Sequence, residues 1–229
     1  WNALPSTTKE EARGAGMPNI VIFAAPSLQP EEARGYLPDA DIRPPAKRGD
    51  VTAAAAAGAE VIVIIDGVFF QNESVGHKEI LAALRSGVKF YGSSSMGALR
   101  AAEMEPFGMV GVGKIFEAYK SGKIVADDEV GLLYDPESGM ALSDPMVNMR
   151  ASFSRAVAEG FLSAEEEAAL LKTCKGIYYP DRTYRRVVKE SPLDEEKKKA
   201  LLSWLKTNAV DQKHEDAKAC LALVRDTYV

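Results

Sequence analysis

Two short runs of apolar residues constrain the fold of this chain most strongly. Residues 19–24 (NIVIFA) and 60–65 (EVIVII) carry one polar residue each, a pattern typical of strands that are buried on both faces of a sheet. A third run follows at 88–91, and segments with helical patterns separate the three. Because strands that alternate with helices pair in parallel through right-handed crossovers, the sequence predicts a Rossmann-like α/β sheet with flanking helices.

The strand pattern ends before residue 150, and the chain divides into three predicted parts. Residues 1–16 are polar and punctuated by Ala and Gly, and we interpret them as a disordered leader or extension that precedes a native start at Met17. Residues 17–149 form the predicted α/β core, and residues 150–229 form a predicted C-terminal helical part. Within this part, Ser163 and Glu166 match the S-x-x-E capping box at a helix start.

Composition and charge exclude several classes of protein. The 28 Lys and Arg residues are outnumbered by 33 Asp and Glu residues, and the net charge of −5 argues against a nucleic-acid-binding protein, which needs a basic surface. The apolar runs are too short to span a bilayer, and no secretory signal pattern is present. We therefore expect a cytoplasmic protein that binds neither nucleic acid nor membrane.

Metal and cofactor chemistry has little support in the sequence. Its cysteines are Cys174 and Cys220 and its histidines are His77 and His214, without a CxxC or HxxxH pattern. No zinc site is predicted, and the cysteines are interpreted as buried thiols. Residues 127–129 (DDE) could bind a divalent metal, although a solvated helix start is the simpler interpretation. We expect no metal and no cofactor.

One glycine-rich segment matches a P-loop only in part. Residues 108–114 (GMVGVGK) satisfy the pattern G-x-x-x-x-G-K. Ile115, however, occupies the position at which a P-loop carries the Ser or Thr that binds magnesium. In addition, no buried strand is predicted before the segment. We therefore predict no nucleotide site there.

A short basic cluster in the helical part has two interpretations. It lies among tyrosines in an otherwise acidic protein and consists of Arg182, Arg185, Arg186 and Lys189. It is either a solvated face or a docking patch for an acidic protein partner. We predict that the C-terminal helical part serves mainly in protein docking.

The loops that follow the three predicted strands carry the chemistry. Sites in parallel sheets form at the carboxyl ends of strands, and here these ends are residues 26–27 (PS), 66–67 (DG) and 92–97 (GSSSMG). The third loop enters a helix directly, so it would expose a hydroxyl and aim free amide groups at a ligand. It predicts either a nucleophile beside an oxyanion hole or a tight turn that merely requires small residues.

A serine nucleophile needs a base, and the helix predicted after the second strand begins with two candidates at the same sheet edge. His77 is in phase with Leu81 and Leu84 on the face toward the sheet. Lys78 lies beside that stripe, where burial on the floor of a cleft would lower its pKa and leave a neutral amine that activates serine. The spacing does not choose between His77 and Lys78.

Six segments of the chain resemble the TfuA-like proteins. In chain order they are 26–28 (PSL), 43–50 (RPPAKRGD), 65–69 (IDGVF), 77–81 (HKEIL), 95–103 (SMGALRAAE) and 106–113 (PFGMVGVG). The resemblance covers about residues 19–150 and fades in the C-terminal part. Because several separate motifs follow in the same order, the resemblance is specific.

This resemblance implies a role in the thioamidation of peptide backbones. TfuA-like proteins are partners of YcaO enzymes, which use ATP to activate a backbone amide of a peptide or protein substrate. Together the two proteins replace the amide oxygen by sulfur. The TfuA-like partner is understood to hydrolyse the thiocarboxylate of a ThiS-like sulfur carrier, to release sulfide for the YcaO enzyme and to strengthen substrate engagement. A Ser–Lys pair is attributed to its site.

The resemblance also assigns residues of this chain to that site. Ser95 matches the serine, because it alone among Ser93, Ser94 and Ser95 lies within the SMGALR motif, and Lys78 matches the lysine. Ser95 would attack the carbonyl carbon and Lys78 would take its proton. Backbone amides near Met96 and Gly97, two residues of the same motif, would hold the oxyanion. Supporting or carrier-binding roles are expected for Asp66, Gly67, His77 and Arg100.

An alternative function remains open at this point. The chain would then be a non-catalytic adaptor that docks the sulfur carrier and the YcaO enzyme, and the serine loop would bind an anion. Release of sulfide from a thiocarboxylated carrier separates the two functions.

Overall fold

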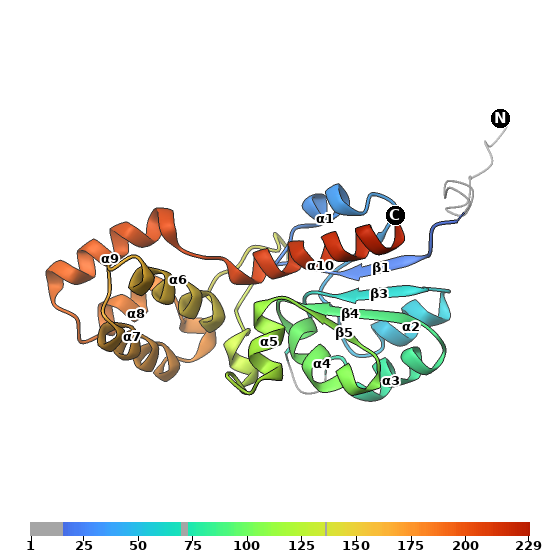
Figure 1. The fold of residues 1–229 in the computed structure, drawn as a ribbon, viewed down its shortest axis with the longest axis horizontal. Coiled ribbons are helices and arrows are strands. Elements are labelled where there is room, and N and C mark those ends of the chain that lie inside the picture. The colour runs from blue at the N-terminus through green and yellow to red at the C-terminus, as the bar shows by residue number, and fades with distance from the viewer. Residues whose placement is uncertain (1–15, 70–72, 136) are drawn as a thin grey trace.

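The chain folds into two lobes. The computed structural model describes residues 16–69, 73–135 and 137–229, so the predicted leader at residues 1–16 lies outside the described residues except for Gly16. One lobe contains a sheet with helices on both of its faces, and the other contains helices alone (Figure 1). The predicted α/β core with a C-terminal helical region is therefore confirmed.

The sheet has five parallel strands in the order β2-β1-β3-β4-β5. The strands are β1 (Ile20–Phe23), β2 (Asp41–Arg43), β3 (Val61–Ile64), β4 (Lys89–Ser93) and β5 (Val110–Val112). The sequence predicted the three central strands, whereas β2 and β5 are edge strands of three residues and are too short to give an apolar pattern. Because β3 rather than β2 extends the sheet on the far side of β1, a topological switch point lies between β1 and β3.

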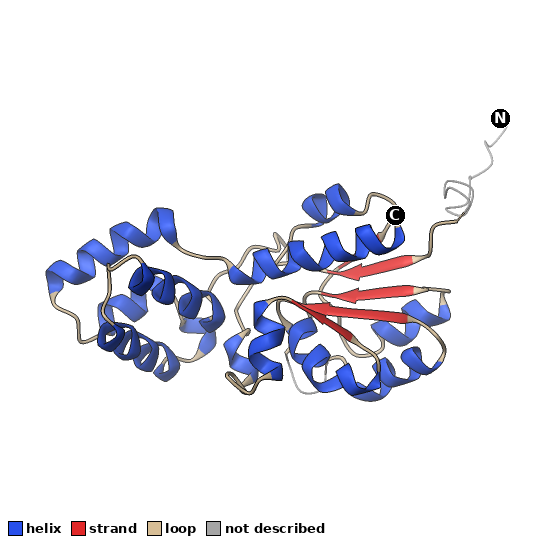
Figure 2. Cartoon of the chain, viewed as in Figure 1, coloured by secondary structure: helices blue, strands red, loops and turns tan. Residues whose placement is uncertain are grey.

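Helices cover both faces of the sheet, as Figure 2 shows. One face carries α2 (Asp50–Ala56), α3 (His77–Arg85), α4 (Met96–Met104) and α5 (Lys114–Lys120). The other carries α1 (Pro30–Tyr36) and α10 (Gln212–Tyr228). Side chains alternate along the strands, so Ile62 and Ile64 pack toward the first group while Val61 and Val63 pack toward the second.

The second lobe is a bundle of four helices around its own core. Its helices are α6 (Met146–Ala158), α7 (Ala164–Gly176), α8 (Tyr184–Glu190) and α9 (Glu195–Asn208). Phe153, Leu170 and Leu201 are fully buried among them. The predicted capping box is confirmed, because Ser163 Oγ accepts a hydrogen bond from the Glu166 amide and the Glu166 side chain accepts one from the Ser163 amide.

Helix α10 leaves this bundle and returns to the sheet, so the helical part predicted for residues 150–229 is divided between the two lobes. Ala217, Cys220, Leu221 and Val224 form a buried stripe against the sheet face that α1 covers only in part. Their i, i+3, i+4 and i+7 spacing is that of a helix with one apolar face. Burial of this stripe holds the C-terminal helix beside β4 and β5.

Two further expectations concern cysteines and membranes. Cys174 and Cys220 are both free and buried, as predicted. Within the described residues, no helix combines the length and apolar character needed to cross a membrane.

Candidate active site

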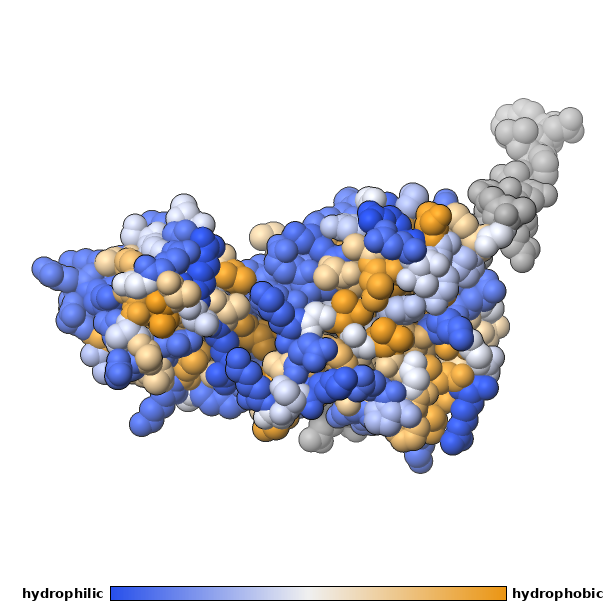
Figure 3. Space-filling view, in the orientation of Figure 1, coloured by the Kyte–Doolittle hydropathy of each residue, from blue (hydrophilic) through white to orange (hydrophobic). Residues whose placement is uncertain are grey.

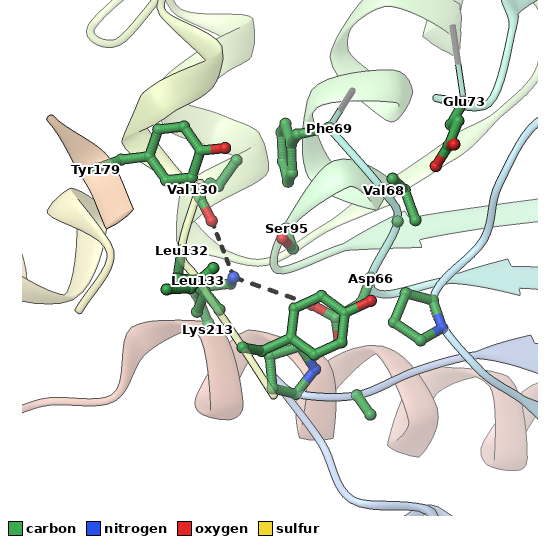
Figure 4. A pocket seen from close by; sticks show the side chains of 15 residues that line it. Asp66, Val68, Phe69, Glu73, Ser95, Val130, Leu132, Leu133, Tyr179 and Lys213 are labelled. Carbon is green, nitrogen blue, oxygen red and sulfur yellow. Dashed lines mark hydrogen bonds and ion pairs between the residues drawn. The ribbon is translucent and has the colours of Figure 1, made fainter. Parts of the chain in front are cut away.

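A pocket of about 300 Å³ lies at the switch point, at the carboxyl ends of β1 and β3 (Figure 4). The loop after β1 contributes Pro26, the loop after β3 contributes Asp66 and Gly67, and the turn after β4 contributes Ser95. Three more distant segments also contribute to the lining, with residues Val130, Leu132, Leu133, Tyr134, Tyr179 and Lys213. The pocket is thus largely apolar, with a few polar groups that converge on it.

The turn from β4 to α4 is tight because two of its positions have no room for a side chain. A Cβ at Gly97 would lie 1.7 Å from the Ile64 carbonyl oxygen, and a Cβ at Gly92 would lie 2.2 Å from the Gly97 oxygen. The first turn of α4 therefore contacts the end of β3 directly. This close approach brings Ser95, the residue that precedes α4, to the pocket beside Asp66.

The structure separates the three consecutive serines by their surroundings. The Ser93 hydroxyl donates to the Val112 carbonyl at 2.7 Å and thereby links β4 to β5. Ser94 is buried in a left-handed conformation with φ of 67°, and its hydroxyl has no partner among the described residues. Of the three, Ser95 alone lines the pocket, where Asp66 is also part of the lining.

Asp66 is the buried carboxylate of the pocket. It accepts hydrogen bonds from the Ser27 amide at 3.0 Å and from the Ser27 hydroxyl at 2.6 Å. Burial raises the pKa of the Asp66 carboxyl, while nearby Lys213 and the hydrogen bonds from Ser27 oppose that rise. The predicted strand ends at 26–27 and 66–67 therefore meet at one site.

Lys213 is the site residue that the sequence analysis missed. It lies in the first turn of α10, is 2% exposed, and its Nζ donates to the Val130 carbonyl at 3.0 Å. The same nitrogen lies 3.9 Å from Asp66 Oδ1, as the dashed lines in Figure 4 mark. Burial lowers the pKa of the Lys213 amine, and the Asp66 carboxylate partly opposes this shift.

A signal for Lys213 was present in the sequence. Lys213 is in phase with Ala217 at i+4 and Cys220 at i+7 on the apolar stripe of α10. The same reasoning led to Lys78 on α3. Periodicity can place a lysine at the edge of an apolar stripe. It does not tell whether that lysine faces the pocket or the solvent.

The structure does not place Lys78 or His77 as predicted. Lys78 is exposed on α3 and is not among the residues that line the pocket. The expectation that Lys78 is buried on the floor of a cleft is therefore wrong. His77 is 52% exposed, and its Nε2 lies 2.8 Å from a carboxylate oxygen of Glu103 rather than facing the sheet. The buried positions of α3 are Ile80 and Ala83, so residues 77 and 78 of its first turn face outward.

The remaining candidates lie near the pocket in different roles. Gly67 lines it, and a Cβ there would lie 2.8 Å from the Met96 side chain. The Gly97 amide already donates to the Ile65 carbonyl at 3.3 Å, whereas the Met96 amide has no hydrogen-bond partner among the described residues. Of the two predicted oxyanion donors, Met96 is thus the one that is free.

Arg100 is occupied by neighbours of its own. Its guanidinium donates to the Val75 carbonyl at 2.9 Å and to Glu103 at 2.7 Å. It lines an adjacent groove, which shares Phe69 with the pocket. A role in gripping the substrate tail stays a prediction for Arg100.

Two of the acidic residues at 127–129 form ion pairs with basic side chains, one of which, Arg182, belongs to the predicted basic cluster. Asp128 pairs with Lys175 and with Arg182, and buried Glu129 pairs with Arg150. The interpretation of 127–129 as a solvated helix start is therefore wrong for Glu129. Within residues 16–69, 73–135 and 137–229, no three His, Cys, Asp or Glu side chains are grouped as a metal site would require.

Arg182 is a structural residue. It is 1% exposed, and besides Asp128 it binds the carbonyl oxygens of Cys174 and Ile177. The prediction that Arg182 belongs to an exposed docking patch is therefore wrong. Arg185 and Lys189 are exposed, and Arg186 forms ion pairs with Asp181 and Glu190.

The P-loop-like segment is closed by a carboxylate of the protein itself. Strand β5, which the sequence did not predict, precedes α5 here, but Asp216 of α10 accepts a hydrogen bond from the Ile115 amide at 2.7 Å. A Cβ at Gly113 would lie 2.4 Å from the Asp216 carboxyl carbon. The Ile115 amide at the start of α5 and the space beside Gly113 are thus both taken by the Asp216 carboxylate, where a P-loop would hold a phosphate.

The fold and the pocket define a doubly wound α/β protein with a buried Ser, Asp and Lys at its switch point. A family model described as TfuA-like protein matches residues 66–183, just over half of the chain, and the chain belongs to this family. Membership implies a YcaO-associated role in thioamidation. A search of curated proteins gave no match. The family match ends before α10, so Lys213 lies outside it.

Proposed function

We propose that this TfuA-like protein hydrolyses the thiocarboxylate of a ThiS-like sulfur carrier and releases sulfide for a YcaO enzyme. The observation that carries the proposal is the meeting of Ser95, Asp66 and Lys213 in one pocket. A hydroxyl, a carboxyl and an amine that converge in a largely apolar pocket suit the hydrolysis of an acyl group. Family membership supports the link to YcaO chemistry.

Ser95 is the proposed nucleophile and Lys213 the proposed base. In the reaction, Ser95 Oγ attacks the carbonyl carbon of the thiocarboxylate while the neutral Lys213 amine takes the hydroxyl proton. The Met96 amide is the candidate donor to the oxygen on which negative charge develops. The protonated amine then gives its proton to sulfur as the C–S bond breaks, so that the sulfur leaves as hydrosulfide.

The second half of the reaction regenerates the enzyme. Lys213 takes a proton from a water molecule, which attacks the Ser95 ester. The ester C–O bond breaks, the proton returns to Ser95 Oγ, and the carrier leaves with an ordinary carboxylate. An oxygen atom from water has then replaced the sulfur atom on the carrier, without any oxidation or reduction.

Lys213 is preferred to Lys78 because of its burial and its contacts. A base must lose its proton near neutral pH, and only a buried lysine has the lowered pKa that this requires. Lys213 is buried, lies 3.9 Å from Asp66 and shares the pocket with Ser95, whereas Lys78 is exposed. Asp66 lines the same pocket as Ser95 and lies 3.9 Å from the Lys213 amine, so we assign it a positioning role between the two.

Replacement of the nucleophile tests the proposal. Ser95→Ala should lower sulfide release from thiocarboxylated carrier at least about 10³-fold, because the covalent route is lost. Binding of the carrier should remain, since a hydroxyl is all that is removed. Sulfide is measured by a colorimetric assay and binding by calorimetry. Ser94→Ala is the matched control, because Ser94 is buried in the same turn and does not line the pocket.

Two outcomes would contradict the assignment. Wild-type turnover in Ser95→Ala, together with its loss in Ser94→Ala, would move the nucleophile by one residue. If the wild-type protein binds the carrier without releasing sulfide, the protein is an adaptor instead.

A further inference from the structure

Exposed apolar side chains gather at the mouth of the pocket. Leu133, Met140 and Leu142 are 44%, 65% and 57% exposed, and Tyr178 is 69% exposed. We call these four residues the mouth surface. Contact with a partner would remove the apolar area of these side chains from water, which favours binding.

Backbone contacts hold three of these residues together. The Leu142 amide donates to the Leu133 carbonyl at 2.7 Å, and the Asp135 amide donates to the Met140 carbonyl at 2.8 Å. An isolated antiparallel bridge between Tyr134 and Ala141 lies between these two contacts. The segments that carry Leu133, Met140 and Leu142 are thus paired side by side.

The mouth surface is continuous with the pocket. Leu133 belongs to both, since it lines the pocket and is also exposed. Tyr178 joins the pocket through Tyr179, whose ring centroid lies 5.0 Å away and which lines the pocket directly. Figure 4 shows Leu133 and Tyr179 on the same side of Ser95. A molecule that reaches Ser95 through this side must pass over these apolar side chains.

Elsewhere the exposed apolar side chains are dispersed. On the face drawn in Figure 3, hydrophobic residues form small separate groups among hydrophilic ones. Among the described residues, the other exposed large apolar side chains lie between α4 and α5, shortly after α5, on α10 and directly after it: Phe107, Val110, Val125, Leu223 and Val229. The mouth surface therefore differs from the rest of the chain by its link to a candidate site.

The charges around the mouth surface define its partner further. Residues 131–144 contain no lysine or arginine, and they carry the carboxylates of Asp135 and Glu137. Asp144, in the same segment, is half-buried and accepts a hydrogen bond from the Tyr184 amide, so it is not part of this rim. Glu73 adds a carboxylate to the pocket lining itself. An apolar centre with an acidic rim is complementary to an apolar patch with basic residues around it.

We propose that the mouth surface docks the folded body of a protein whose extended C-terminal tail enters the pocket toward Ser95. This inference rests on the proposed function and names the partner surface of the same site. A tail of two to four residues spans about 7–14 Å, which suits a pocket of about 300 Å³. The partner carries an apolar patch with basic residues next to that tail.

The test separates docking from chemistry by using two substrates. The variant is Met140→Lys with Leu142→Lys, which places two positive charges on exposed positions that line neither the pocket nor a buried core and that would face the basic residues of the partner. The control is Phe107→Lys, at a position that is 56% exposed in another part of the chain. The substrates are thiocarboxylated ThiS-like carrier and the thiocarboxylate of N-acetylglycine, which has the reacting group but no protein body.

We expect KM for the carrier to rise about tenfold or more in the double variant, with kcat unchanged, because two apolar contacts become unfavourable. Hydrolysis of N-acetylglycine thiocarboxylate should stay at the wild-type rate, and Phe107→Lys should match wild type with both substrates. Calorimetry with the unmodified carrier should show the same loss of affinity. Circular dichroism and thermal unfolding establish that each variant is folded.

Three results would overturn the inference. Unchanged KM and affinity for the carrier would show that its body does not touch the mouth surface. An equal loss with both substrates would mean that the substitutions damage the pocket. Dissociation of a wild-type dimer by the double variant would assign the surface to a second copy of the chain. If wild type hydrolyses neither substrate, the proposed function fails, while the affinity measurement still decides whether the surface docks the carrier.

Discussion

Replacement of Lys213 by methionine is the sharpest perturbation that the structure suggests. Methionine has nearly the length and volume of lysine but no amine, so it fills the space beside Asp66 without a base. Lys78→Met is the matched control, because Lys78 is exposed and does not line the pocket. Lys213→Arg is the second comparison, since a guanidinium keeps the positive charge and does not give up its proton.

The structure sets the size of the expected effects. Loss of a general base lowers the rate about 10²–10⁴-fold, and we expect Lys213→Met and Lys213→Arg both to fall in this range. For stability, the Val130 carbonyl loses its donor at 3.0 Å and Asp66 loses its nearby cation, at a cost of about 1–3 kcal/mol. Removal of the amine also removes the free-energy cost of burying it, which opposes this loss of stability. The free energy of unfolding should therefore change by less than about 3 kcal/mol.

The assay is sulfide release at saturating carrier, with urea unfolding of each variant as the control for folding. Lys78→Met should retain the wild-type rate and lie within about 0.5 kcal/mol of wild-type stability. Wild-type turnover in Lys213→Met, with loss in Lys78→Met, would refute the assignment of Lys213. An active Lys213→Arg would show that position 213 supplies positive charge only.

Two further predictions follow from the pocket and from its supporting turn. Because the neutral amine is the active form and burial lowers the pKa of Lys213 from 10.5, kcat/KM should rise with pH to a midpoint below 10.5, and a profile without this limb in wild type would contradict the role of Lys213. Gly97→Ala should destabilise the protein by at least about 2 kcal/mol, since its Cβ would lie 1.7 Å from the Ile64 oxygen. Gly35→Ala in α1 meets no atom within 4 Å and should unfold at the wild-type urea concentration or slightly above it.

The central sheet was predictable because its strands are buried on both faces. Burial from both sides leaves β1 and β3 no position for a polar residue, so each is a continuous apolar run in the sequence. A helix directly after the small-residue loop at 92–97 was also predicted, and α4 begins there at Met96. By contrast, α5 and α8 have seven residues each, and so few residues give a weak periodic signal.

The candidate site was only half predictable. Ser95 and Asp66 follow buried strands, and the rule that parallel strands end at one edge brings them together. Lys213 lies 147 positions after Asp66 in the sequence and reaches the site only because α10 returns to the sheet. No local pattern encodes that return, since it depends on which apolar stripe covers the face beside α1. Lys213 was missed for this reason, whereas the choice of Lys78 failed because residues 77 and 78 face outward from α3.

The return of α10 also ties the proposed base to the helical bundle. Asn148 of α6 donates from its amide nitrogen to Asp211 at 3.0 Å, and its amide oxygen accepts from the Lys213 backbone amide at 3.1 Å. The Val210 amide, just before α10, donates to the Ser152 hydroxyl of α6 at 2.8 Å. The first turn of α10 is therefore positioned by the bundle, while its later turns are positioned by the sheet. A site that takes its hydroxyl and carboxyl from one lobe and its amine from the junction is complete only when both lobes are folded and packed together.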